Sequence, residues 1–234
     1  MAELVVALDF PRPASALALV ERLGSVPHSF KVGLELFTAG GPAVVRELVS
    51  RGGRVFLDLK LHDIPNTVGG AAAAAAELDA TYLTVHAGGG GRMVSAARRA
   101  VEGSATRVLA VTVLTSLSAE DLAEIRGPGA PDPVEEVARL ARIAVDSGAH
   151  GVVASVGEIA GLRSVVGADA LMVAPGIRLP GDEVDDQRRV FGPAEAVHAG
   201  ADLLVVGRPI SRASDPTAAL GRFLSAMRPE MSET

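Results

Sequence analysis

The sequence predicts an α/β fold, a (β/α)8 TIM barrel, from three observations: eight short aliphatic runs, a helix-like segment between successive runs, and apolar residues on both faces of the runs. Strands that are buried on both faces are typical of parallel sheets, whose connections are usually helices. Undivided barrels commonly reach about 200 to 250 residues. We therefore expect one domain over residues 1–228 and a flexible tail at 229–234.

The eight runs extend along the whole chain. Each is rich in β-branched or aliphatic residues and has the length of a strand. In order they are LVVALD (4–9), HSFKVGL (28–34), RVFLDLKL (54–61), YLTVHAG (82–88), RVLAVTVL (107–114), GVVAS (151–155), ALMVAPGI (170–177) and LLVVGR (203–208). The interval after the fifth run is longer than the others and contains the loop GPGAPDP.

The segments between the runs have the pattern of amphipathic helices. Apolar residues recur every three or four positions in ASALALVERLG (14–24) and PVEEVARLARIAVDSG (133–148). Gly24 is a stop signal, and Asp215 before Pro216 is a start signal for the last helix. The alternative, an open doubly wound sheet, is less favoured because LDFPRP follows the first run where a dinucleotide-binding GxGxxG turn belongs.

The composition argues against several functional classes. The net charge is −6 and the basic residues are scattered, so binding to nucleic acid is not favoured. Aromatic residues make up 3% of the chain, too few for a base-stacking platform. No apolar run reaches the roughly 18 to 20 residues that span a bilayer, and the absence of cysteine is typical of a reducing compartment. We expect a cytoplasmic protein with no nucleic-acid partner and no membrane partner.

Polar residues gather where the predicted strands end, the face that carries the active site in barrels of this type. Some charge is expected at the end of any strand, so these residues do not by themselves establish a site. They are Asp9, Lys31, Asp58, Lys60, His86, Thr115 and Arg208.

The stretch VFLDLKLHDIPNTV (55–68) favours a site over a structural network of ion pairs, because side chains alternate between the two faces of a strand. One face carries only the apolar residues Val55, Leu57, Leu59 and Leu61. The other carries Phe56, Asp58 and Lys60, which we expect to point into the barrel. Asp63 follows the strand, and Thr67 lies one helical turn later if Pro65 starts a helix.

The carboxylates around Lys60 predict a particular chemistry. They favour its ammonium form, which is a poor Schiff-base nucleophile and a good proton donor. A substrate carboxylate about 4 Å from Asp58 would experience roughly 4 kcal/mol of repulsion at an effective dielectric constant of about 20. Loss of that carboxylate as CO2 relieves the repulsion, and Lys60 can stabilise and then protonate the carbanion. The array predicts a decarboxylase that needs no metal.

The last two loops predict a phosphate site, which barrels often place after strands seven and eight. APGIRLPGDEVDDQR (174–188) and VVGRPI (205–210) supply glycine amides, Gln187 and the arginines Arg178 and Arg208. The composition of loop 178–192 predicts a lid over the ligand. The alternative is that the two arginines pair with nearby acids such as Asp182 or Asp202.

With these residues in view, the chain resembles the orotidine 5'-phosphate decarboxylase family over nearly its whole length. FLDLKLHDIPNTV (56–68) is the most specific stretch, although Leu61 stands where Phe is common. Four other motifs follow in the expected order: LTS (114–116), APGIR (174–178), DQ (186–187) and GRPI (207–210). The resemblance implies decarboxylation of orotidine 5'-phosphate to UMP and CO2 in pyrimidine biosynthesis. It also implies a homodimer with sites at the interface, and no metal or cofactor.

The resemblance also implies the site residues. The catalytic group would be Lys60 as proton donor, Asp58 facing the substrate carboxylate, Lys31 completing the charged chain, and Asp63 reaching with Thr67 into the site of the partner subunit. Asp9 and Lys31 would contact the ribose, and Thr115 with Ser116 the pyrimidine. The phosphate end would use Arg178, Gln187, Gly207 and Arg208, and Ile64 and Pro175 complete the substrate-binding set.

Two other functions remain alternatives from the sequence. A metal-dependent sugar-phosphate decarboxylase or hexulose-phosphate synthase shares the Asp-x-Lys-x-x-Asp motif, but Thr115 and Gln187 favour a pyrimidine ligand. A catalytically silent nucleotide-binding barrel is expected to lack Lys60 or one of the aspartates, and all are present. His62 and His86 are expected to be hydrogen-bonded supports rather than catalysts.

Overall fold

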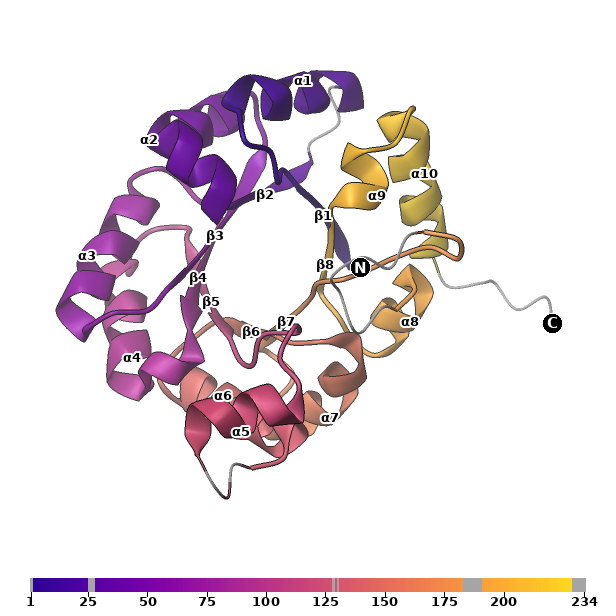
Figure 1. Ribbon diagram of the computed structural model, residues 1–234. Coiled ribbons are helices and arrows are strands. Elements are labelled where there is room, and N and C mark those ends of the chain that lie inside the picture. The colour runs from indigo at the N-terminus through magenta and orange to yellow at the C-terminus, as the bar shows by residue number, and fades with distance from the viewer. Residues whose placement is uncertain (1, 25–27, 128, 130, 183–190, 229–234) are drawn as a thin grey trace.

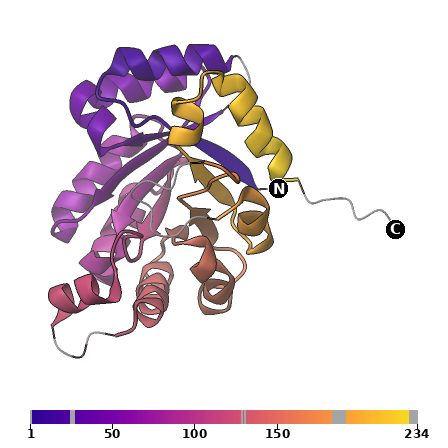
Figure 2. The ribbon, with the colours of Figure 1, turned by 45° about the vertical axis from the view of Figure 1, so that its right-hand side comes forward.

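The computed structural model describes residues 2–24, 28–127, 129, 131–182 and 191–228. Within these ranges eight parallel strands form a closed barrel in chain order, with β8 paired to β1. Helices surround the strands (Figures 1 and 2). The predicted (β/α)8 barrel is confirmed, and the doubly wound alternative is wrong because the sheet has no open edge. The predicted tail at 229–234 lies outside the described residues.

The strands are β1 (Glu3–Ala7), β2 (Ser29–Gly33), β3 (Arg54–Leu61), β4 (Tyr82–His86), β5 (Arg107–Val111), β6 (Gly151–Val153), β7 (Leu171–Ala174) and β8 (Leu203–Val206). The helices are α1 (Pro13–Leu23), α2 (Leu34–Ser50), α3 (Pro65–Ala76), η1 (Ala87–Gly89), α4 (Gly91–Ala100), α5 (Ala119–Arg126), α6 (Pro133–Asp146), α7 (Val156–Val166), α8 (Pro193–His198), α9 (Arg208–Ser211) and α10 (Pro216–Ala226).

Most strands begin within two residues of the predicted positions but end sooner. Strand β5 stops at Val111, for example, three residues before the end of its run, and β8 stops at Val206. The residues that follow each strand leave the hydrogen-bonded ladder and form the loops of one barrel face. Helix α3 begins at Pro65, as predicted, which places Thr67 in its first turn.

Alternating side chains build two separate cores. Inside the barrel a small cluster of eight buried residues fills the space between the strands: Val5, Ala7, Phe56, Tyr82, Leu109, Val173, Leu203 and Val205. Their neighbours along the strands, such as Val55 and Leu57, belong instead to the large outer core under the helices. The inward direction predicted for Phe56 is therefore correct, and this inner cluster forms the floor beneath the strand ends.

Strand β3 departs from regular pairing near its end. Leu57 pairs with Leu83, but the next pair joins Leu61 to Val85. Three residues of β3 therefore lie opposite the single residue Thr84 of β4, and Lys60 has a φ of 49°. Bulges of this kind redirect side chains near active sites, and alternation alone does not predict them.

None of the described helices is both long and apolar enough to cross a membrane.

Candidate active site

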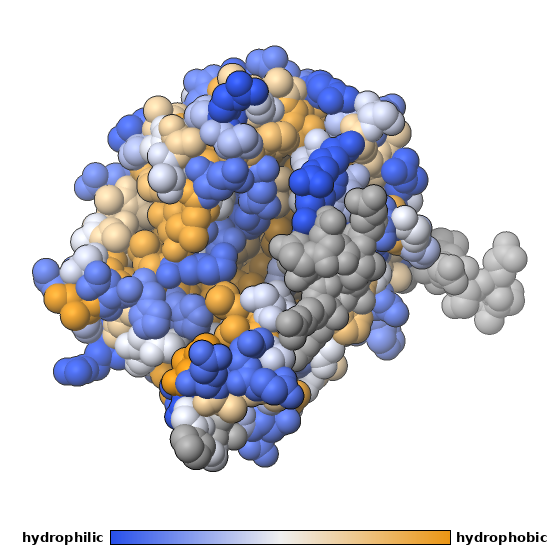
Figure 3. All heavy atoms as spheres, viewed as in Figure 1, coloured by the Kyte–Doolittle hydropathy of each residue, from blue (hydrophilic) through white to orange (hydrophobic). Residues whose placement is uncertain are grey.

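A cavity of about 280 Å³ opens at the carboxyl ends of the strands. Figure 3 shows hydrophilic and hydrophobic residues together on this face of the barrel. The described residues that line the cavity are Ala7, Asp9, Lys31, Phe56, Asp58, Lys60, Val111, Val113, Leu114, Thr115, Val153, Val173, Pro175, Gly176, Arg178, Val205, Gly207 and Arg208. Nine of the predicted site residues are therefore brought together around one space.

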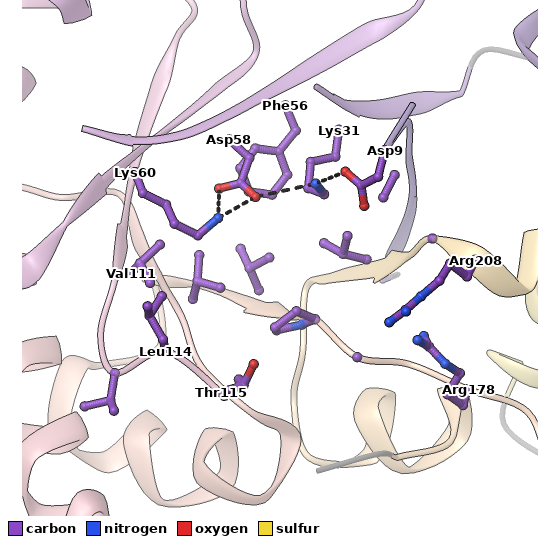
Figure 4. Close-up of a pocket in the computed structure, with 18 residues that line it drawn as sticks. Asp9, Lys31, Phe56, Asp58, Lys60, Val111, Leu114, Thr115, Arg178 and Arg208 are labelled. Atoms are coloured by element: carbon purple, nitrogen blue, oxygen red, sulfur yellow. Dashed lines mark hydrogen bonds and ion pairs between the residues drawn. The ribbon is translucent and has the colours of Figure 1, made fainter. Parts of the chain in front are cut away.

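Four of these residues form a charged chain along one wall of the cavity (Figure 4). Lys60 Nζ lies 2.9 Å from both carboxylate oxygens of Asp58. Lys31 Nζ lies 3.6 Å from Asp58 Oδ2 and 2.8 Å from Asp9 Oδ1. Acids and amines thus alternate across three adjacent strands, β1 to β3, so that the order in space is Asp9, Lys31, Asp58, Lys60.

Asp58 is the central anion of the chain and is buried. Burial alone would raise its pKa, but the ammonium groups of Lys31 and Lys60 and hydrogen bonds from Lys60 and Thr84 outweigh that effect, so its pKa is lowered. Asp58 is therefore a carboxylate throughout the neutral pH range. An incoming carboxylate beside it would meet a full negative charge.

Two residues that the sequence analysis did not identify support this wall. The Thr84 hydroxyl donates a hydrogen bond to Asp58 Oδ1 at 2.9 Å and accepts one from the backbone N–H of Lys60 at 2.9 Å. Gly33 leaves room for the ion pair between Lys31 and Asp9, because a Cβ atom at position 33 would lie only 3.0 Å from Lys31 Nζ. The available signal for Thr84 was a threonine at an inward position of the run YLTV, whose other residues are aromatic or aliphatic.

The rarity of lysine in this chain is a further sequence feature that points to the site. The chain contains 22 Lys and Arg residues, and only Lys31 and Lys60 are lysines. Both line the same cavity. Arginine stays protonated under all ordinary conditions, whereas a lysine ammonium can give up its proton, so the site holds every side-chain amine of the protein.

The opposite end of the cavity carries Arg178 and Arg208, whose guanidinium groups point toward one another (Figure 4). Gly176 and Gly207, which are close to these arginines in sequence, also line the cavity. Of the acids considered as partners for these arginines, Asp202 binds Arg163 at 3.2 Å, and Asp182 accepts a hydrogen bond from the backbone N–H of Leu179. Two converging guanidinium groups favour an anion with several oxygens, such as a phosphate.

The cavity lining also includes apolar side chains. They are Val111, Val113, Leu114, Val153 and Val173, and they suit the faces of a flat ring. Thr115 lies across the cavity from the charged chain (Figure 4), where a hydroxyl can bond the polar edge of such a ring.

The other predicted site residues lie elsewhere. Asp63, Ile64, Thr67 and Ser116 are exposed and do not line the cavity of their own subunit among the described residues. Asp63 Oδ1 accepts a hydrogen bond from the backbone N–H of Ile64 at 2.6 Å. Gln187, with most of the predicted lid, lies outside the described residues.

His62 and His86 stack beside this site with ring centroids 5.2 Å apart. His86 Nδ1 accepts a hydrogen bond from Gly88 N–H. Burial, followed by the charges of His62, Lys60 and Arg126, lowers the pKa of His86, so the ring is neutral near pH 7. Within the described ranges, no three His, Cys, Asp or Glu residues are grouped to hold a metal ion.

Comparison with known proteins agrees with this geometry. The profile of the orotidine 5'-phosphate decarboxylase / HUMPS family matches residues 2–223. Orotidine 5'-phosphate decarboxylases from Laribacter hongkongensis and Anaeromyxobacter sp. (strain K) are 50% and 54% identical to this chain, over 94% and 91% of it and 90% and 92% of their own lengths. The crystal structure of orotidine 5'-phosphate decarboxylase from Lactobacillus acidophilus aligns with a TM-score of 0.87 and 38% identity, covering 98% of this chain and 100% of that one.

Proposed function

The chain belongs to the orotidine 5'-phosphate decarboxylase / HUMPS family, and from that membership we propose how its barrel cavity converts orotidine 5'-phosphate to UMP and CO2. The enzyme is a carboxy-lyase of pyrimidine biosynthesis. One observation carries the mechanism: the Lys60 ammonium lies 2.9 Å from both oxygens of Asp58 at one end of a cavity whose other end holds two arginines.

The proposed reaction breaks one carbon–carbon bond. The bond between C6 of the pyrimidine and the carboxylate carbon breaks, CO2 leaves, and the electron pair stays on C6. The Lys60 ammonium stabilises this carbanion and transfers a proton to it, which gives UMP and a neutral amine that regains its proton from solvent. These steps use the substrate, the side chains of the protein and one proton from solvent, and Asp58 holds the ammonium where the carbanion would form.

The substrate orientation follows from the charges of the cavity. The 5'-phosphate lies at Arg178 and Arg208, which fixes the opposite end of the nucleotide near Asp58 and Lys60. Asp9 and Lys31 bind the ribose hydroxyls, and Thr115 bonds the pyrimidine edge. Phosphate binding far from C6 thereby offsets the unfavourable approach of the substrate carboxylate to Asp58.

The first test is turnover of orotidine 5'-phosphate by the purified protein, followed by the loss of its ultraviolet absorbance in buffer with and without a chelator. We expect equal rates in both, because the proposed proton donor is an amine, which Asp58 holds directly. A rate that disappears with chelator and returns with a divalent cation would favour the metal-dependent sugar-phosphate enzymes of this superfamily.

The homodimer is part of this proposal, as is a cytoplasmic location. Asp63 and Thr67 are exposed at the start of α3 and lie outside the cavity lining of their own subunit. A second copy packed on this face would bring Asp63 of the partner subunit to the Lys60 end of the cavity. Ile64, which is 66% exposed, is the apolar residue that such an interface would bury.

Mixed dimers test whether Asp63 acts across the interface. Lys60→Ala and Asp63→Asn homodimers are each expected to be nearly inactive. After unfolding and refolding an equal mixture, half of the dimers contain one site with both wild-type residues, so activity should return to about a quarter of the wild-type value. Mixed dimers with no recovered activity, confirmed by differently tagged subunits, would show that Asp63 acts within its own chain.

A further inference from the structure

We infer that Thr84 is a positioning residue for the decarboxylation: its hydroxyl fixes the Asp58 carboxylate and the backbone of Lys60 relative to one another. The inference rests on the proposed function, because it concerns how the proton donor of that reaction is held. Thr84 is on β4, is fully buried, and does not line the cavity among the described residues. It therefore acts through Asp58 and Lys60 and not by contact with substrate.

The register of β3 and β4 places Thr84 at this junction. It is the single β4 residue between the pairs Leu57–Leu83 and Leu61–Val85, and it faces the three-residue bulge that contains both Asp58 and Lys60. Tyr82, two positions earlier on the same face of the strand, belongs to the inner cluster. The Thr84 side chain accordingly points to the inner side of the barrel, next to the bulge in β3.

Lys60 needs such a partner because its backbone is strained. A φ of 49° is unusual for a residue other than glycine, aspartate or asparagine, and it persists only where surrounding contacts enforce it. The regular ladder between β3 and β4 is interrupted here, and Thr84 Oγ1 takes the Lys60 N–H. This bond fixes the direction in which the lysine side chain leaves the strand.

The Thr84 hydroxyl makes both hydrogen bonds, as the acceptor in one and as the donor in the other. The oxygen accepts the Lys60 N–H, and its one proton is donated to Asp58 Oδ1. Asp58 in turn binds the Lys60 ammonium with both oxygens. The backbone and the side chain of Lys60 are thus tied through two residues into one closed network. Serine can make the same pair of bonds, whereas valine and alanine cannot.

The test compares Thr84→Val and Thr84→Ser with wild type. Valine keeps the volume and removes the hydroxyl, so we expect kcat to fall about ten- to hundredfold with KM changed less than about twofold. Serine should retain kcat within about threefold, since both hydrogen bonds can reform. Thr106→Val is the matched control: Thr106 is also buried and donates to Ala80 O, but it precedes β5 at the opposite end of the barrel and lies outside the cavity. We expect kcat of this control to equal that of wild type.

A second readout separates positioning from a general loss of stability. Because only Lys31 and Lys60 are lysines, selective ¹⁵N-lysine labelling gives two side-chain ammonium signals. Thr84→Val should shift the Lys60 signal more than that of Lys31, because Lys60 also loses its backbone contact with Thr84, whereas Lys31 lies farther from Asp58 and keeps its bond to Asp9. The acid limb of the rate profile should also move to higher pH, because Asp58 loses one hydrogen bond that favours its ionised form while Lys31 and Lys60 remain beside it.

The inference is overturned if Thr84→Val keeps wild-type kcat with an unshifted Lys60 signal, or if Thr84→Ser loses as much kcat as the valine variant. Should Thr84→Val fail to fold, Thr84→Ala is compared with Thr84→Ser by the same two measurements. Failure of the proposed function is a different result, since then wild type itself would not decarboxylate orotidine 5'-phosphate.

Discussion

Replacing Lys60 with alanine is expected to lower kcat by about ten-thousandfold or more, because in the proposed mechanism this one residue supplies both the cation that stabilises the carbanion and the proton that it accepts. In the structure this ammonium is held by both oxygens of Asp58. Lys31 cannot replace it, because Lys31 Nζ is already bound to Asp9 at 2.8 Å and lies on the other side of Asp58 (Figure 4).

The measurement is single-turnover decarboxylation, with UMP affinity as the control for an intact site. UMP lacks the reacting carboxylate, and in the proposed orientation its phosphate lies at the arginine end, so its dissociation constant should change less than about tenfold in Lys60→Ala. Lys60→Arg separates charge from proton transfer, since a guanidinium keeps the charge but holds its proton. A Lys60→Ala rate within about tenfold of wild type, with UMP affinity preserved, would remove the proposed mechanism.

The barrel and the charged end of its site could be predicted from sequence for a physical reason. Both depend on periodic patterns: apolar runs recur with helices between them, and Asp58 and Lys60 occupy alternate positions of one strand. Such patterns predict directly which face of a strand or helix each side chain occupies. Phe56 and Asp58 accordingly lie where alternation placed them, in the inner cluster and in the cavity wall.

The features that sequence reasoning missed depend on register between strands. The bulge in β3, the positive φ of Lys60 and the contact of Thr84 with Asp58 arise because three residues of one strand face one residue of the next. No period within a single strand encodes that offset. Partners on other elements are likewise not predicted by such a period: Asp202 binds Arg163 of α7 and the backbone N–H of Met172 of β7.

Replacing Asp58 with asparagine is expected to lower kcat by about a thousandfold. Roughly 4 kcal/mol of repulsion with the substrate carboxylate would be lost, which corresponds to about three factors of ten in rate. Asparagine keeps the size of the side chain and an oxygen that accepts hydrogen bonds from Lys60 and Thr84, so the cavity should keep its shape.

The dependence of stability on pH in acid provides a control for the loss of the Asp58 charge. The folded pKa of Asp58 is lowered from 3.8, so its stabilising contribution is present above that value, is lost as pH falls through the folded pKa, and should be missing from the variant.

The change in KM decides which role of Asp58 dominates. Repulsion acts on bound substrate and is relieved as CO2 leaves, so its removal should lower KM together with kcat and leave kcat/KM much less affected. The affinity for UMP, which has no carboxylate at C6, should stay constant and serves as the internal reference. If instead kcat and kcat/KM fall equally at unchanged KM, repulsion is not the source of the rate. The function of Asp58 is then to hold the Lys60 ammonium against the developing carbanion, a role that the 2.9 Å contacts of both its oxygens already allow.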